Sequence, residues 1–265
     1  MKTMFWHELK INSKGLLLWL VVMVMLAGMG SSEYSLLASG GESITLAINA
    51  MPRIARIMFG IYDNISIATP IGYYVCMFLW YCMVAYTHAA YVGATIISSE
   101  ERDKTAEYIF TKPYSRSKII RAKVLAAVVN ISAMTIVTWL MTIFTMVPQM
   151  NGANITKLVA MTMLGMFFTQ LIFMVLGLLC SSIFRTQTAA LRFSTFLVVI
   201  FYTLSIIIEY TGNFSITFLS PFWYFNAPAL LSQGFSVLNI ILTVIIIIIG
   251  LWGMYTKYDK RDLYC

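Results

Sequence analysis

The chain has 265 residues, of which 60% are hydrophobic and only 11% are charged. Because soluble domains carry about 25% charged residues, this composition excludes an ordinary soluble protein and predicts an all-α integral membrane protein. The net charge of +7 fits basic loops on the cytoplasmic side of a membrane, so we expect lipid and no nucleic acid as a partner.

Residues 1–14 contain three lysines among apolar side chains, together with Trp6. This mixture predicts an interfacial helix on the cytoplasmic side, although an ordinary charged tail is the alternative. Residues 15–32 form the first predicted span, because 18 uncharged residues are just long enough for a hydrocarbon core of about 30 Å. Residues 44–61 then have apolar side chains at helical spacing, which predicts an outer surface helix that is broken near Pro52.

Five further apolar runs predict membrane-spanning helices, which gives six spans in total. They lie at about 70–97, 124–147, 158–183, 193–209 and 237–255. Residues 210–236 are rich in aromatic side chains but are interrupted by prolines and glycines, which favours an extracellular or re-entrant segment. Residues 44–61 and 214–235 are candidates for a lid over an exit path.

The distribution of basic residues predicts the orientation. Six spans place both termini on the same side of the membrane. Of the 18 lysines and arginines, all but Arg53, Arg56 and Lys157 lie at the termini, in residues 100–123 or in the loop at 185–192. Since basic loops stay in the cytoplasm, we expect a multi-pass plasma-membrane protein with both termini cytoplasmic.

Residues 100–123 form the one densely charged segment, with four acidic and seven basic side chains. Within it, residues 105–112 predict a short helix, and Pro113 ends that helix because a proline disfavours helix in the residue before it. The helix has an apolar face of three residues at helical spacing: Ala106, Ile109 and Phe110. A docking helix for a soluble partner and an ordinary solvated loop are both compatible with this pattern.

The order of residues in this segment resembles the intracellular loop of the ABC-2 type permeases, the membrane subunits of one class of ATP-binding-cassette transporters. The family pattern is an acidic cluster, Gly-Thr-x-Glu, a few apolar residues, proline, and Ser-Arg before a basic run. The matching residues are Glu100, Glu101, Thr105, Glu107, Ile109, Phe110, Pro113, Ser115 and Arg116. Lys104 stands where the family has glycine. Ser220-Pro221-Phe222 before the last span and Lys260-Arg261-Asp262-Leu263 after it also fit the family.

The resemblance implies a permease subunit that pairs with a second copy or a related permease, binds a cytoplasmic ATPase subunit, and exports an unidentified substrate. The nine matching residues would couple it to the ATPase. No G-x-x-x-x-G-K-[ST] motif occurs in the chain, so we expect ATP and Mg²⁺ in the partner, no cofactor here and no enzymatic activity. The alternative is a membrane sensor or scaffold whose charged loop binds a signalling partner.

Two polar residues within predicted spans are further candidates. His88 lies inside the second predicted span, where we expect a hydrogen-bonded packing residue, with a substrate or proton ligand as the alternative. Glu209 ends the fifth predicted span and is expected to be a solvated boundary residue, with a buried functional acid as the alternative. The chain has only two histidines, and its four cysteines are scattered, so no catalytic set and no metal site is predicted.

Overall fold

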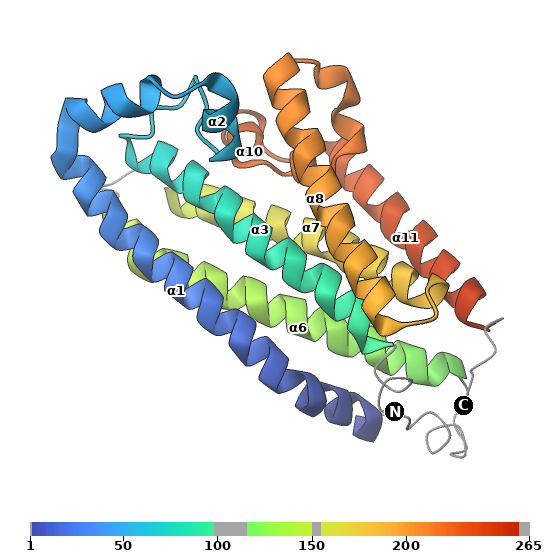
Figure 1. Cartoon of the computed structure of the whole chain (residues 1–265). Coiled ribbons are helices and arrows are strands. Elements are labelled where there is room, and N and C mark those ends of the chain that lie inside the picture. The colour runs from blue at the N-terminus through green and yellow to red at the C-terminus, as the bar shows by residue number, and fades with distance from the viewer. Residues whose placement is uncertain (1, 98–115, 150–154, 260–265) are drawn as a thin grey trace.

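The computed structural model describes residues 2–97, 116–149 and 155–259, and within these ranges every regular secondary-structure element is a helix (Figure 1). The long helices are α1 (Lys2–Asn49), α3 (Pro70–Ile96), α6 (Arg116–Thr145), α7 (Ile155–Ile183), α8 (Gln187–Thr211) and α11 (Val237–Asp259). All six contain a stretch that is long and apolar enough to cross a membrane. The prediction of an all-α chain with six candidate spans is confirmed.

Short elements connect the long helices at one end of the bundle. They are α2 (Arg53–Met58), η1 (Val147–Gln149), η2 (Phe214–Leu219), α9 (Pro221–Tyr224) and α10 (Ala227–Gln233). Local signals start them: Pro52 precedes α2, and the side chain of Asn226 caps α10 by accepting a hydrogen bond from the Ala229 amide at 3.0 Å. In Figure 1, α2 and α10 lie at the same end of the bundle.

Helix α1 is longer than the first predicted span. It continues through the serines, glycines and Glu33 of residues 31–43, which are residue types typical of a loop. It ends at Asn49, just before Pro52. Figure 1 shows its last part turning away from the direction of the rest. Residues 2–14 continue into this helix without a break, so their interfacial position stays a prediction.

Helices α3 and α7 form the centre of the bundle. In their most apolar stretches 67% of the residues are buried, compared with 17–22% in α1, α8 and α11. A Cβ atom on Gly93 of α3 would lie only 2.1 Å from the carbonyl oxygen of Met174, and one on Gly177 of α7 would lie 2.5 Å from that of Ala90. The two backbones therefore touch directly, as they do where small residues line the contact between membrane helices.

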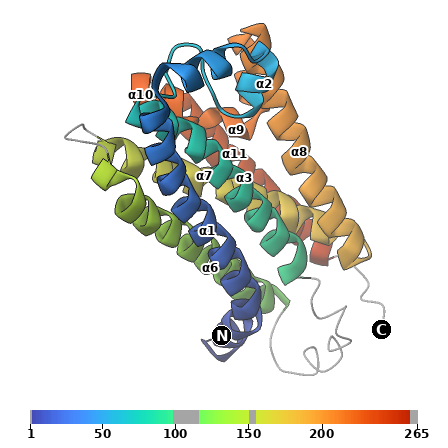
Figure 2. The same cartoon turned by 60° about the vertical axis from the view of Figure 1, so that its left-hand side comes forward.

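Buried hydrogen bonds join α7 to its neighbours. The hydroxyls of Tyr74 and Thr162 are 2.5 Å apart and link α3 to α7. The Thr135 hydroxyl donates to the Gln170 side-chain oxygen at 2.6 Å and links α6 to α7. On the outside of the bundle, α1 and α6 lie side by side in both views (Figures 1 and 2).

Candidate functional site

A buried ion pair joins three helices at the end of the bundle where α1 begins. The Nζ atom of Lys123 lies 2.8 Å from Oε1 of Glu8 and donates to the carbonyl oxygen of Ile96 at 2.9 Å. Lys123 is 1% exposed and Glu8 is 6% exposed. Each buried charge is costly unless it is paired and hydrogen-bonded, and this geometry supplies both. We call Glu8, Ile96 and Lys123 the Lys123 clamp.

The clamp forms where α3 ends. Ile96 is the last residue of α3, and carbonyl groups in the last turn of a helix lack intrahelical partners and carry negative partial charge. The ammonium group of Lys123 is therefore favoured there. One residue earlier, the side-chain amide of Gln187 donates to the Thr95 carbonyl at 3.4 Å. Side chains of α6 and α8 thus donate hydrogen bonds to the end of α3, and α1 is joined to it through Lys123.

This position relates the clamp to the predicted coupling segment. Residues 98–115 follow α3 and precede α6, so the clamp holds the two helices that flank them. Eight of the nine predicted coupling residues, from Glu100 to Ser115, lie outside the described residues, as does the predicted helix at 105–112. Arg116 is the first residue of α6. The sequence gives no sign of the partnership between Lys123 and Glu8, which are 115 positions apart.

His88 lies in α3 and is fully buried. Its ring packs against Trp19 of α1, with ring centroids 5.6 Å apart. The ring is packed, but the expected hydrogen bond is absent, because neither ring nitrogen has a hydrogen-bond partner in the described part of the chain. His88 borders a cavity between α1, α3, α6 and the start of α8. Across residues 2–97, 116–149 and 155–259, no group of three His, Cys, Asp or Glu side chains is placed to hold a metal ion.

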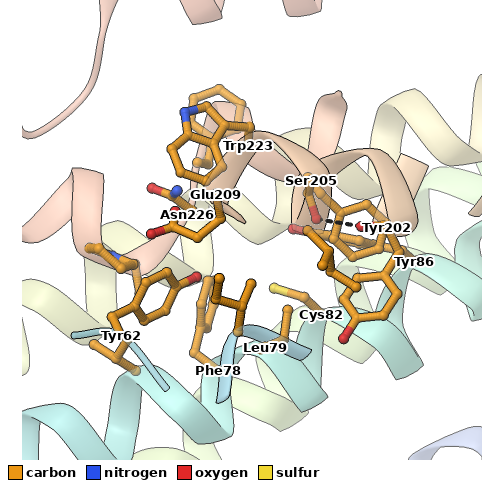
Figure 3. Close-up of a pocket in the computed structure, with 17 residues that line it drawn as sticks. Tyr62, Phe78, Leu79, Cys82, Tyr86, Tyr202, Ser205, Glu209, Trp223 and Asn226 are labelled. Carbon is orange, nitrogen blue, oxygen red and sulfur yellow. Dashed lines mark hydrogen bonds between the residues drawn. The ribbon is translucent and has the colours of Figure 1, made fainter. Parts of the chain in front are cut away.

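Glu209 borders a second pocket, at the opposite end of the bundle. Aromatic side chains from α3, α8 and α9 line it, and Figure 3 shows Glu209 and Asn226 between the rings of Trp223 and Tyr62. Burial raises the pKa of Tyr62 above its usual range, and the carboxylate of Glu209 adds to this shift, so the hydroxyl stays protonated. Glu209 is half-buried in the wall of this pocket rather than simply solvated at a helix end.

Helix α2 is fastened to the end of α8 beside this pocket. Arg53 donates to the carbonyl oxygen of Tyr210 at 3.2 Å, and the Tyr202 hydroxyl donates to that of Met58 at 2.5 Å. Arg53 and Arg56 also pair with Asp63, at 3.2 Å and 3.0 Å. Since Ile57 of α2 lines the pocket, these contacts hold α2 over it.

If α2 acts as a cover, Arg53→Met will expose Cys82, a buried free thiol in the pocket wall. With the other three cysteines replaced by alanine, we expect a polar maleimide to label Cys82 about three to ten times faster, because hydrogen bonds to a half-exposed charged group contribute about 1 kcal/mol. Labelling of the purified protein is followed by mass spectrometry. The control is Lys157→Met, which removes an exposed charge outside these contacts. Equal labelling in both variants would exclude a cover.

Comparison with known protein families identifies a matching family model. A protein-family model described as ABC-2 family transporter protein matches residues 3–263. A search of curated proteins found no match. The matched range covers nearly the whole chain and includes both clamp side chains, both pockets and residues 98–115.

Proposed function

Because the chain belongs to the ABC-2 family of transporter membrane proteins, we propose that it is the permease subunit of an exporter driven by a separate ATPase. In this proposal the ATPase binds ATP and Mg²⁺ in the cytoplasm, and the permease works in the plasma membrane, paired with a second copy or a related chain. The end that carries the Lys123 clamp faces the cytoplasm.

The observation that carries the proposal is the Lys123 clamp. A partner that pushes on residues 98–115 acts on the end of α3 and the start of α6, because these helices flank the segment. Lys123 ties both helices to α1 through Glu8, so three helices are displaced together. Helix α3 then passes the displacement to α7 through the contact at Gly93 and Gly177. A contiguous path of packed helices of this kind is one physical route by which a displacement reaches a distant site.

The partner is tested by co-purification. The tagged chain is extracted from its native membranes in mild detergent, and a co-purifying P-loop ATPase is identified by mass spectrometry. We expect the ATPase to be retained and the complex to hydrolyse ATP in lipid vesicles. If the tagged chain retains no ATPase, a membrane sensor or scaffold becomes the better explanation.

Reversing the charge at Glu107 tests the coupling residues. Glu107→Arg places a cation in the first turn of the predicted helix, where the helix dipole favours acids. We expect normal insertion in the membrane but about tenfold lower ATP-driven transport, which corresponds to about 1.4 kcal/mol of lost docking energy. The matched control is Lys157→Glu, a charge reversal at the other end of the bundle. Full transport by Glu107→Arg would contradict the coupling role.

A further inference from the structure

The cavity beside His88 has largely polar walls. It has a volume of about 160 Å³. The polar residues that line it are Asn12, His88, Tyr91, Thr95, Asn130 and Gln187, and Trp19 and three aliphatic side chains complete the wall. Within the described parts of the chain, no lysine, arginine, aspartate or glutamate lines the cavity. An ion in this cavity would be uncompensated in a medium of low polarity, so the walls disfavour charged ligands.

Three buried polar atoms of residues that line this cavity lack hydrogen-bond partners among the described residues: Nδ1 and Nε2 of His88 and Oδ1 of Asn130. His88 is 0% exposed and Asn130 is 2% exposed. Buried polar atoms are almost always hydrogen-bonded, to protein or to ordered water, and each orphaned one costs about 1–3 kcal/mol. A neutral imidazole offers one donor and one acceptor, and Asn130 offers a further acceptor.

We propose that this cavity binds an uncharged hydrogen-bonding group, a hydroxyl or a carboxamide, and holds water when that group is absent. Such a group is both donor and acceptor, so it can accept from the imidazole N–H or donate to one of the two orphaned acceptors, and water can pair with the atoms that remain. The ring of Trp19 covers the carbon skeleton to which the group is attached. Only the further step, that this group belongs to the transported molecule, rests on the proposed function.

The cavity adjoins the Lys123 clamp. Thr95 in its wall is next to Ile96 of the clamp, and the side chain of Asn12 in its wall donates to the Glu8 carbonyl at 2.9 Å. A ligand that orders His88 and Asn130 therefore acts on the same ends of α1 and α3 that the clamp joins. A ligand in the cavity would therefore change how residues 98–115 respond to the ATPase partner. In this way a transported molecule would stimulate ATP hydrolysis.

Trp19 reports on the cavity directly. The other five tryptophans are replaced by phenylalanine, and the purified chain is studied without any ATPase. Acrylamide, a small uncharged carboxamide that quenches tryptophan fluorescence, is the probe. We expect strong, saturable quenching by acrylamide and weak quenching by iodide or caesium. Acetamide, which does not quench, should compete with acrylamide, whereas acetate and methylammonium should not. A single-Trp139 variant, whose tryptophan lies outside the cavity wall, should show no such competition.

Substitutions at His88 separate binding from simple access. In His88→Leu with Asn130→Leu we expect acrylamide quenching of Trp19 to fall by a factor of about two or more, with loss of acetamide competition, because the cavity becomes smaller and apolar. His88→Gln keeps one donor and one acceptor and should restore the competition. Unchanged quenching in the double leucine variant, or equal quenching by iodide, overturns the proposal. Since no ATPase is present, that result does not bear on the proposed transport function. Conversely, failure of the co-purification does not bear on ligand binding in the cavity.

Discussion

Replacing Lys123 by methionine is expected to destabilise the protein by about 3–5 kcal/mol, because the carboxylate of Glu8 then stays buried without a counter-charge. Glu8 is 6% exposed, so water cannot take the place of the ammonium group without a rearrangement. The midpoint of thermal unfolding in detergent measures the loss. Lys118→Met is the control, since Lys118 lies on the same helix but is exposed, and we expect its effect to stay within about 0.5 kcal/mol.

The double variant Glu8→Gln with Lys123→Met separates stability from coupling. Removing both charges takes away the unpaired carboxylate, so most of the stability should return. The ion pair that joins α1 to α6 is still absent, so we expect ATP-driven transport to stay low. A double variant that is as unstable as Lys123→Met would contradict the account of the clamp as an ion pair. One that transports normally would remove its role in coupling.

The second large effect is expected where the backbones of α3 and α7 touch. Gly93→Ala places a methyl group 2.1 Å from the carbonyl oxygen of Met174, and a backbone atom cannot move aside like a flexible side chain. We expect the helices to separate and the free energy of unfolding to fall by about 2–3 kcal/mol. Unfolding in a mixed detergent series gives the measurement.

A glycine elsewhere in the bundle provides a matched control for Gly93→Ala. A methyl group on Gly28 of α1 meets no atom within 4 Å, so Gly28→Ala should leave stability unchanged or slightly raise it through its better helix propensity. Gly177→Ala, with its Cβ 2.5 Å from the Ala90 carbonyl, should behave like Gly93→Ala. If Gly93→Ala and Gly28→Ala unfold alike, the close contact of α3 and α7 is not important for stability.

The six candidate spans were predictable because a bilayer imposes length and composition on each crossing helix. Long apolar runs bounded by charge, proline or glycine reflect that constraint. The end of α1 was not predictable in this way, since serines, glycines and Glu33 are typical of a loop, whereas the backbone stays helical to Asn49. Such local preferences are weak, at most about 1 kcal/mol per residue even for glycine, and so do not by themselves end a helix.

The partners of polar residues were harder to predict than the helices. Lys123 sits in a run of basic residues and so resembles an ordinary cytoplasmic charge, while Glu8 is an isolated acid 115 positions away. Nothing local indicates that the two meet. His88 was recognisable as a polar residue in a span, but the empty space beside it depends on side chains from four helices. Such sites arise from packing, which one sequence does not encode in any short pattern.

The Lys123 clamp also bears on the order in which the protein is made. Glu8 leaves the ribosome long before Lys123, and at about 5–20 residues per second the 115 residues between them take roughly 6–23 s to synthesise. During that interval the carboxylate of Glu8 must remain hydrated, since burying it alone is too unfavourable. The part of α1 that carries Glu8 can therefore pack against the ends of α3 and α6 only after Lys123 has been synthesised, while the apolar part of α1 is free to insert in the membrane earlier.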